Sequence, residues 1–321
     1  MNPTSLQVRV ARKVREALDI CTFELMDVGG KPLPAFAAGS HIDVHLPDGI
    51  TRQYSLCNDP QESHRYLIGV LKDPATRGGS RAMHDSVNEG DMLTISPPRN
   101  HFPLAHEAAH SVLLAGGIGV TPILCMAERL AISGASFEMH YATRSRERTA
   151  FYDRIGRGGF ASKVQFHLDD GDEAQKLKLP ALLATPKAGT HLYVCGPKGF
   201  MDAVLGMARA NGWPEPQIHY EYFSAEAVKS LADGSFEVQL ASSGKIVVIP
   251  KDQSVTQALA KAGVEILTSC EQGVCGTCIT RVLQGEPDHR DLYFTPEEQA
   301  KNDQFTPCCS RSRSPLLVLD L

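Results

Sequence analysis

The sequence predicts a multidomain protein with an antiparallel β-barrel, an α/β domain built on a parallel sheet, and a small α+β domain. Three features of the chain support this prediction. The first hundred residues are short alternating apolar and polar runs between turn residues, which is the pattern of antiparallel strands. The middle of the chain alternates strand-like and helix-like segments, which favours a parallel sheet. The last third contains cysteines with the spacing of a metal centre.

Length and composition agree with a globular protein that has more than one core. The chain has 321 residues, of which 42% are hydrophobic and 21% charged, and its net charge is −5. Two or three domains are expected at this length. The negative charge argues against a nucleic-acid partner, and no apolar run approaches the ~18 residues of a membrane span. Because the N-terminus has no apolar signal core, we expect a cytoplasmic protein whose nine cysteines are not a disulfide framework.

Residues 1–103 are expected to form the barrel. Short strands near residues 6–10, 22–25, 42–46 and 66–70 are separated by clusters of Gly, Pro and Asp. These clusters are typical of turns, and strands repeated at this spacing without helices favour a small antiparallel barrel.

A strand of this barrel has the chemistry of a flavin site. Alternation along residues 52–56 puts Arg52 and Tyr54 on one face and Gln53 and Ser55 on the other. A guanidinium suits a phosphate, an aromatic plane suits an isoalloxazine ring, and a hydroxyl can meet the reactive edge of that ring. The alternative is an ordinary strand with a surface arginine.

A glycine-rich turn follows the flavin-like strand. Arg77, Gly78, Gly79 and Ser80 offer two glycine amides that can approach an anion, then a hydroxyl. Taken alone, this segment is equally compatible with a common surface turn. The two motifs in this order favour a flavin domain.

Residues 104–226 are expected to form a nucleotide-binding domain. An apolar strand at 111–115 runs into Gly116, Gly117 and Gly119, and a helix with one apolar face follows. A strand, a glycine turn and a helix start make an anion site suited to a pyrophosphate. The glycine spacing differs from the dehydrogenase fingerprint, which argues against a conventional Rossmann dehydrogenase.

Two more strand ends are expected to complete the nucleotide site, because ligands bind at the carboxyl ends of strands in open parallel sheets. The residues at these ends are Thr143, Arg144, Cys195, Gly196 and Pro197. Cys195 could also be a buried strand-end thiol with no role in binding. A last strand at residues 218–223 is expected to bring Phe223 back to the flavin ring.

Residues 236–321 are expected to form the domain that holds a metal centre, after a polar linker at residues 224–235. Three cysteines follow the C-x4-C-x2-C pattern of a plant-type 2Fe–2S loop, and a fourth comes later. They are Cys270, Cys275 and Cys278, followed by Cys308 or Cys309. Gly273 and Gly276 allow the loop to wrap closely. A structural zinc site would favour two Cys-x2-Cys pairs or Cys with His, so it is the weaker alternative.

A hairpin at residues 236–249 and a helix that begins after Ser254 precede the cysteine loop in this domain. A polar segment, Asp288-His289-Arg290-Asp291, follows it. This segment could be a metal or acid–base site, but a turn whose charges pair with one another is favoured.

Together, these motifs resemble the phthalate dioxygenase reductase and vanillate demethylase reductase family over essentially the whole chain. The resemblance is carried by residues 52–59, 77–80, 115–119, 195–197, 270–278, 288–291 and 317–321. It implies a β-grasp ferredoxin domain and FMN rather than FAD, with the phosphate at the Gly79–Ser80 turn. It also favours Cys308 over Cys309 as the fourth ligand, because relatives have a Cys-Val-Ser-Arg run at this place.

The resemblance implies three groups of site residues. The FMN residues are Arg52, Gln53, Tyr54, Ser55, Gly69, Val70, Leu71, Arg77, Gly78, Gly79, Ser80, Thr121 and Phe223. The NAD(P)H residues are Gly116, Gly117, Gly119, Thr143, Arg144, Cys195, Gly196 and Pro197. Ser55, Cys195 and Phe223 are the residues expected nearest to hydride transfer, and Cys270, Cys275, Cys278 and Cys308 are the expected cluster ligands.

The implied function is a monomeric reductase that passes electrons from NADH through FMN to the 2Fe–2S cluster. The electrons then go to a Rieske-type terminal oxygenase, aromatic-ring or O-demethylating, in a transient encounter. NADPH remains open, because Arg144 and Arg146 flank Ser145 and no acidic residue stands beside Arg144 in the sequence. A reductase for a diiron or haem-thiolate oxygenase is an alternative, and so is a non-catalytic metal-binding carrier or sensor.

Overall fold

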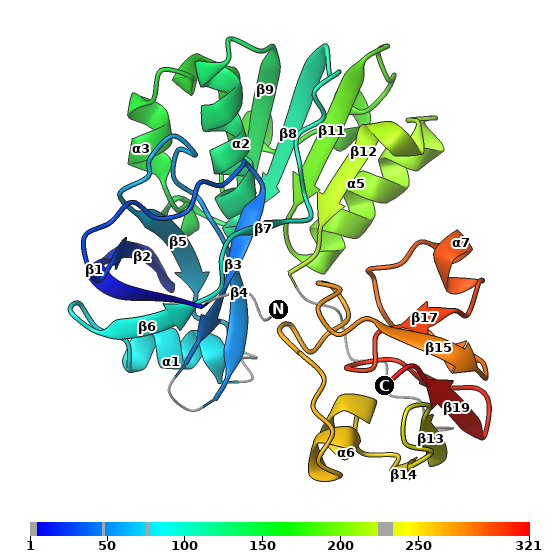
Figure 1. The fold of residues 1–321 in the computed structure, drawn as a ribbon. Coiled ribbons are helices and arrows are strands. Elements are labelled where there is room, and N and C mark those ends of the chain that lie inside the picture. The colour runs from blue at the N-terminus through cyan, green and yellow to red at the C-terminus, as the bar shows by residue number, and fades with distance from the viewer. Residues whose placement is uncertain (1–4, 47–48, 75–77, 224–233) are drawn as a thin grey trace. The chain divides into compact units, whose positions relative to one another are not determined.

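The computed structural model describes residues 5–46, 49–74, 78–223 and 234–321 (Figure 1). It consists of two compact units, Met1–Glu221 and Tyr222–Leu321. The first unit contains an antiparallel barrel and a parallel sheet, and the second contains a mixed sheet with the cysteine loop. This is the architecture that the sequence predicts, although the domain boundaries within it remain predictions.

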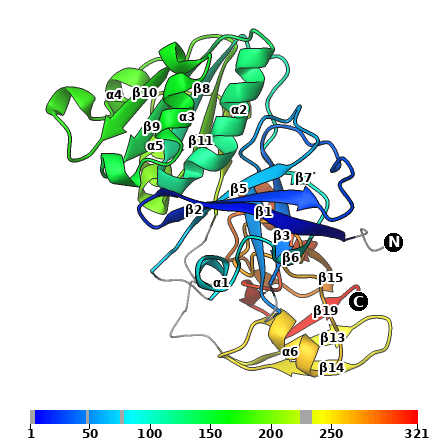
Figure 2. The same cartoon turned by 90° about the vertical axis from the view of Figure 1, so that its left-hand side faces the viewer.

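An antiparallel sheet of seven strands forms the barrel (Figure 2). The strands are β1 (Leu6–Ala17), β2 (Ile20–Asp27), β3 (Ser40–His45), β4 (Thr51–Ser55), β5 (Tyr66–Leu71), β6 (Met92–Ile95) and β7 (Arg99–Asn100). Their order is β4-β3-β6-β1-β2-β5, with β7 paired to β3. The two end strands meet through an isolated bridge between Leu56 and Ile68, so the sheet closes on itself.

A short helix, α1 (Gly79–Asp85), begins where the sequence predicts only a glycine-rich turn. Gly78 adopts a φ of 101°, which side-chain-bearing residues rarely reach. Met83 of the helix is fully buried in the barrel core. The expectation of a barrel without helices is wrong here, because the burial of Met83, with Ala82 packed against the same core, stabilises a helix that is too short to show periodicity.

All five strands of the second sheet are parallel. They are β8 (His110–Gly116), β9 (Phe137–Thr143), β10 (Val164–Leu168), β11 (Thr190–Cys195) and β12 (Ile218–Glu221), in the order β10-β9-β8-β11-β12. Connections leave β8 and β11 in opposite directions. The carboxyl ends of these two strands are therefore the switch point where such sheets bind ligands.

Helices cover this sheet (Figure 1). The main ones are α2 (Val120–Ile132), which leads from β8 to β9, and α5 (Lys198–Ala210), which leads from β11 to β12. Right-handed crossovers in opposite directions put these two helices on opposite faces. The predicted apolar face of α2 is buried: Ile123, Met126, Ala127 and Leu130. The shorter helices are α3 (Tyr152–Arg157), α4 (Leu179–Leu182), η1 (Gly117–Gly119), η2 (Arg146–Arg148), η3 (Ala161–Lys163), η4 (Glu173–Gln175) and η5 (Glu215–Gln217).

The last strand of the parallel sheet is shorter than expected. It ends at Glu221 rather than Phe223, because its partner β11 ends at Cys195, opposite Glu221. Gly196 and Pro197 follow, and a proline has no N–H to continue the ladder.

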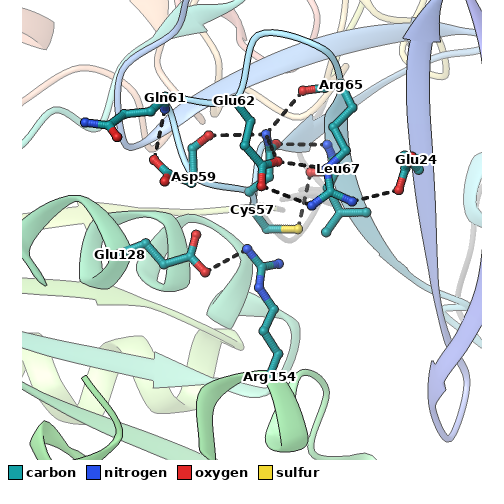
Figure 3. A network of polar contacts seen from close by, with 10 residues as sticks. Glu24, Cys57, Asp59, Gln61, Glu62, Arg65, Leu67, Glu128 and Arg154 are labelled. Carbon is teal, nitrogen blue, oxygen red and sulfur yellow. Dashed lines mark hydrogen bonds and ion pairs between the residues drawn. The ribbon is translucent and has the colours of Figure 1, made fainter. Parts of the chain in front are cut away.

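A polar network connects the barrel to the helices of the nucleotide sheet within the first unit (Figure 3). Arg154 of α3 donates to Glu128 of α2 at 2.7 Å, and both lie beside Cys57, which follows the flavin-like strand. On the barrel side, Arg65 pairs with Glu24 at 2.7 Å and with Glu62 at 2.8 Å. The network fixes the chain just after Ser55 relative to the nucleotide sheet.

The second unit has a mixed sheet with the order β14-β13-β19-β15-β17. Its strands are β13 (Phe236–Leu240), β14 (Ile246–Ile249), β15 (Thr280–Gln284), β17 (Gln304–Phe305) and β19 (Leu316–Leu319). A separate ladder joins β16 (Pro287–Asp288) to β18 (Arg311–Ser312), and the helices are α6 (Val255–Lys261) and α7 (Pro296–Gln299). The predicted hairpin and the Ser254 cap are confirmed, the cap as a capping box with Gln257. Residues 224–233 of the expected linker lie outside the described residues.

No helix among the described residues has both the length and the apolar composition that crossing a membrane requires.

Candidate functional site

The two glycine motifs of the nucleotide sheet pack backbone against backbone. Ala115 at the end of β8 lies opposite Cys195 at the end of β11. A Cβ atom at Gly119 would collide with the carbonyl of Cys195, and one at Gly196 would lie 3.0 Å from the Cα of Gly116. Only glycine allows this approach. The structure therefore brings the two predicted nucleotide motifs together at the switch point.

A cavity of about 890 Å³ opens at this edge of the sheet. The predicted residues that line it are Leu71, Gly116, Gly117, Thr143, Arg144 and Pro197. Residues that the sequence did not indicate also line it: Asp19 and Lys72 from the barrel, and Arg148 and Asp169 from the nucleotide domain. The cavity is large enough for a cofactor-sized ligand.

An acidic residue does stand near Arg144, contrary to the expectation from the sequence. The backbone N–H of Asp169 donates to Thr143 O at 3.0 Å, and that of Asp170 donates to Arg144 O at 3.2 Å. Both acids follow β10, the strand beside β9. Because parallel neighbours end at the same edge, residues far apart in sequence meet here, and only the strand register would have shown it.

Arg146, the other cation considered for a 2′-phosphate, has different contacts. Its guanidinium lies 3.5 Å from the centroid of the Tyr152 ring and 3.3 Å from the carboxylate of Asp153. It is not among the residues that line the cavity.

The flavin-like strand and the start of α1 form a close cradle. A Cβ atom at Gly79 would lie 2.8 Å from Nε of Arg52, so the glycine allows the helix to close over the arginine. The buried hydroxyl of Tyr54 has no hydrogen-bond partner among the residues that the structure describes. Burial raises the pKa of this phenol, which keeps it protonated and able to donate. An orphaned donor beside a glycine cradle fits a bound phosphate-bearing ring.

Three other predicted flavin residues contact different parts of the first unit. Gly69 packs on Thr121, since a Cβ atom there would lie 2.9 Å from the threonine methyl. The side chain of Val70 points into the barrel core, and its carbonyl contacts His84 Nε2 at 2.8 Å. The amide of Gln53 contacts His41 Nε2 at 3.3 Å. Val70 therefore has a structural role in the barrel.

Two further predicted flavin residues are Arg77 and Ser80. Arg77 lies outside the described residues. The hydroxyl of Ser80 accepts from the backbone N–H of Asp73 at 3.2 Å.

Ser55 and Cys195 meet at a residue that the sequence analysis missed, Glu221. The Ser55 hydroxyl donates to Glu221 Oε2 at 3.4 Å, and Cys195 lies opposite Glu221 in the ladder. Withdrawal from solvent raises the pKa of Glu221 to about 8, which the Ser55 hydrogen bond lowers only in part. Burial likewise raises the pKa of Cys195 well above its ordinary value, so its thiol stays protonated. If the alternation of the strand is continued to Phe223, Glu221 falls on the same face as Phe223. The sequence therefore contained a signal for Glu221.

Phe223 is exposed and belongs to the second unit. Its predicted contact with the flavin ring therefore stays a prediction.

The cysteine loop lies between α6 and β15, and it has the backbone conformation that the sequence indicates. Gly273 and Gly276 have φ values of 71° and 69°. Glu271 also has a positive φ, 57°, which the sequence did not reveal. The backbone N–H of Gln272 points at Cys270 Sγ (3.4 Å), and that of Thr277 points at Cys275 Sγ (3.5 Å). Amide donors aimed at sulfur stabilise thiolate ligands.

The four candidate cluster cysteines are buried and form no disulfide, and their sulfurs contact one another in a row from Cys275 through Cys270 and Cys308 to Cys278. Hydrogen bonds with Cys275 and Cys308 lower the pKa of Cys270, and the bond with Cys270 raises the pKa of Cys275. Cys308 also hydrogen-bonds Cys278. Within the described part of the chain, no three or more His, Cys, Asp or Glu side chains are grouped to hold a metal ion. A 2Fe–2S cluster takes two cysteine thiolates on each of its two irons, so four thiols that are not grouped around one point fit it better than they fit one zinc ion.

The Cys309 sulfur contacts that of Cys308 and lies against Gly273 of the cysteine loop, but its other partners differ from those of Cys308. Its sulfur contacts the Thr306 hydroxyl at 3.3 Å and the Ser310 hydroxyl at 3.8 Å. Cys308 is the thiol that contacts Cys270 and Cys278. These contacts support Cys308 as the fourth ligand, which stays a prediction.

The charges of the Asp288-His289-Arg290-Asp291 segment pair with one another, as expected. Arg290 donates to Asp288 at 2.6 and 2.8 Å, and His289 Nδ1 lies 3.4 Å from Asp291 Oδ1.

Two family models match the chain. Residues 238–313 match a 2Fe–2S iron–sulfur cluster binding domain. Residues 92–218 match the N-terminal domain of dimethylamine monooxygenase subunit DmmA-like proteins. The first match covers all four candidate cluster ligands, so the metal centre of the chain is a 2Fe–2S cluster.

Similar proteins match nearly the whole chain. A vanillate O-demethylase oxidoreductase from Pseudomonas putida is 58% identical over 95% of this chain and 96% of its own. The solved structure of phthalate dioxygenase reductase, 41% identical, has a TM-score of 0.79 over 99% of this chain and 98% of its own. An intact type IV self-sufficient cytochrome P450 monooxygenase, 40% identical, has a TM-score of 0.85 over 99% of this chain and 41% of its own.

A flavin domain with an antiparallel sheet, a parallel nucleotide sheet and a 2Fe–2S domain in one chain define an electron-transfer oxidoreductase. At this identity and coverage, the chain belongs to the phthalate dioxygenase reductase family.

Proposed function

We propose that this protein is the reductase component of a Rieske-type oxygenase system that acts on aromatic rings or aromatic O-methyl groups, with NADH as the electron donor. One observation carries the proposal. A nucleotide cavity and a four-cysteine site occur in a chain that matches a vanillate O-demethylase oxidoreductase over 95% of its length. The combination supports electron flow from a nucleotide, through a flavin, to the cluster.

NADH is the proposed donor because of Asp169. This residue lines the cavity beside the ends of β9 and β10. An acidic residue at a strand end can accept a hydrogen bond from a free ribose 2′-hydroxyl and repels a 2′-phosphate. Asp169→Asn is expected to raise the use of NADPH relative to NADH, measured as the ratio of the two kcat/KM values. An unchanged ratio would assign the preference to other residues.

FMN is the proposed flavin. Bound there, it takes two electrons as a hydride and releases them one at a time. Arg52 and the amides at Gly79 and Ser80 would hold the phosphate, and Tyr54 would lie against the ring with its unpaired hydroxyl available to donate. FMN in the supernatant of heat-denatured protein is the expected result, and FAD there would contradict the assignment.

Glu221 and Ser55 are proposed to handle the proton. Each NADH gives up a hydride, and once both of its electrons have been passed on singly, one proton remains to be released. The Ser55 hydroxyl and Glu221 Oε2 form a hydrogen bond at 3.4 Å, and the raised pKa of Glu221 lets its carboxyl hold a proton near neutral pH. The Cys195 thiol stays protonated, so its proposed role is steric and depends on its size and its position at the end of β11.

The partner is proposed to dock transiently near the cysteine loop. Electron transfer requires close approach, and the segment from Glu271 to Thr277 presents few charges. Encounters between redox proteins are typically small and short-lived.

A haem-thiolate partner is the second candidate, favoured by the match to the self-sufficient cytochrome P450 monooxygenase. The deciding experiment adds purified protein and NADH to a vanillate-type Rieske oxygenase or to a haem-thiolate monooxygenase, and follows reduction of each metal centre spectroscopically. Faster reduction of the Rieske centre is expected. Preferential reduction of the haem protein would overturn the proposal.

A further inference from the structure

The turn at residues 288–291 has no part in the proposed electron path, yet the segment that contains it is hydrogen-bonded to the cysteine loop. The backbone N–H of Leu292 donates to the carbonyl of Gly273 at 3.0 Å. The backbone N–H of Arg290 donates to the Ser310 hydroxyl at 3.2 Å. One short segment is therefore hydrogen-bonded both to the cysteine loop and to the loop that contains the fourth ligand.

Both glycines of the cysteine loop pack directly on this segment. A Cβ atom at Gly276 would lie 2.5 Å from the ring of Tyr293. A Cβ atom at Gly273 would lie 2.8 Å from the Cβ of Asp291. The Cys309 sulfur would lie 2.4 Å from the same Cβ atom. The loop can wrap the cluster only because these positions have no side chain, and at Gly273 the space is shared by a cysteine sulfur and an acidic residue.

The Asp291 carboxylate is buried and fixed. Its side chain is 0% exposed. Oδ2 accepts from the backbone N–H of Phe294 at 2.8 Å and from that of Tyr293 at 3.2 Å. Oδ1 faces His289 Nδ1 at 3.4 Å, and neither ring nitrogen of His289 has a hydrogen-bond partner among the described residues. These contacts leave the carboxylate one orientation, beside the loop between Cys270 and Cys275.

A fixed negative charge at this place acts on the cluster. Reduction adds an electron, and a nearby carboxylate that water does not screen makes that addition less favourable. The potential of an iron–sulfur centre depends on the local charge and on hydrogen bonds to its sulfurs. We propose that Asp291 is a positioning residue that lowers the reduction potential of the 2Fe–2S cluster and holds the cysteine loop against residues 290–293.

This inference deepens the proposed function, on which its biological meaning rests. A lower cluster potential shifts electrons away from the cluster at equilibrium with the flavin, and it makes the reduced cluster a stronger donor to a partner. The turn would therefore set how strongly the reduced cluster can reduce its acceptor.

The test is Asp291→Asn in the full-length protein with its cofactors. The substitution removes the charge and keeps the shape, and the amide oxygen can still accept from Phe294. The cluster midpoint potential is measured by redox titration with mediators at one fixed pH, followed by the electron paramagnetic resonance of the reduced cluster. We expect a more positive potential, by about 59 mV, which is a tenfold shift in a one-electron equilibrium.

Asp288→Asn is the matched control. It removes the same charge three residues earlier, where the carboxylate is bound by Arg290 and 26% exposed. Its potential should stay close to that of the wild-type protein. An equal shift in the two variants, or no shift in Asp291→Asn, would overturn the proposal.

Two more variants separate charge from packing. Asp291→Glu keeps the charge and is expected to keep a potential near the wild-type value, whereas Asp291→Ser is expected to follow Asp291→Asn. If Asp291→Asn fails to assemble a cluster, as judged by iron and sulfide content, the serine variant decides. A glutamate variant shifted as far as the neutral variants would attribute the effect to packing and overturn the assignment of charge. Because the titration uses neither NADH nor an oxygenase, its result is distinguishable from a failure of the proposed function.

Discussion

The cysteine site and the proposed hydride-transfer site are built in opposite ways. Cys270, Cys275 and Cys278 come from one short loop, whereas Ser55, Cys195 and Glu221 come from the ends of β4, β11 and β12. The loop fixes most of its ligands by local backbone geometry. The strand ends meet only through the register of a sheet and the packing of a barrel against it. A contiguous site is therefore readable from residue spacing, and a distributed site only in part.

Removal of one cluster ligand is expected to have the largest effect. Cys275→Ser should lower the rate of electron delivery to an oxygenase by at least about 100-fold, because iron–sulfur clusters depend on thiolate ligands. Reduction of the flavin by NADH should continue, since all of the proposed flavin residues except Phe223 lie in the other unit. Stopped-flow spectroscopy separates the two steps. Slow flavin reduction in this variant would show that the two sites depend on each other.

The residues of the two sites show which features could be predicted from the sequence and which could not. The cysteine spacing and the paired glycine motifs indicated the chemistry, because tight loops require particular residues at particular positions. Glu221 and Asp169 were missed. Each follows or ends a strand as an ordinary acidic residue, and only the pairing of β11 with β12 and of β9 with β10 gives it a site.

The fold shows the same division. Strand and helix types followed from periodicity, and most predicted segments lie within one or two residues of the observed ones. Helix α1 and the early end of β12 were missed, since both depend on a tertiary contact: Met83 with the barrel core, and β12 with the end of β11.

The adjacent cysteines allow a direct test of the fourth ligand. Cys308→Ser should abolish or strongly deplete the cluster, because the Cys308 sulfur contacts Cys270 and Cys278. Cys309→Ser should keep full iron and sulfide content, because the Cys309 sulfur contacts Thr306 and a serine can make the same hydrogen bond. Iron content and visible absorption measure the outcome. Equal depletion in both variants would mean that Cys309 also supports the cluster.

A pH dependence is expected at the distributed site. Glu221 has a pKa of about 8, above its ordinary value, so its carboxyl is neutral below that pH and becomes charged above it. A new negative charge beside Ser55 opposes arrival of a hydride, so flavin reduction by NADH should slow as the pH rises through 8. The decrease should be about tenfold, which corresponds to about 1.4 kcal/mol.

Glu221→Gln should remove this dependence, because glutamine does not titrate. Glu215→Gln is the matched control, an exposed acidic residue before the opposite end of β12 that pairs with Arg209 at 2.6 Å. Pre-steady-state flavin reduction at pH 6–10 is the measurement. A pH step that persists in Glu221→Gln would assign the titration to another group.

The smallest expected effect concerns the ion pair between Asp19 and Arg148, which lies on the wall of the nucleotide cavity. The contact is 3.4 Å long between half-exposed side chains, and pairs of this kind are weak. The β1–β2 hairpin, which contains Asp19, is bound to the nucleotide domain without this ion pair, because the backbone N–H of Leu18 donates to Glu147 O at 2.7 Å. Arg148 can therefore leave the carboxylate of Asp19 and bind a phosphate of NADH instead.

This exchange predicts effects of opposite sign from the two partners of one ion pair. Arg148→Ala should weaken NADH binding by about fivefold, and Asp19→Asn should tighten it by about threefold, since each change corresponds to less than about 1 kcal/mol. Arg146→Ala is the control, a cation two positions away that does not line the cavity. Saturation of the flavin reduction rate with NADH gives the three dissociation constants. Weaker binding in both Arg148→Ala and Asp19→Asn would mean that the pair only braces the wall of the cavity.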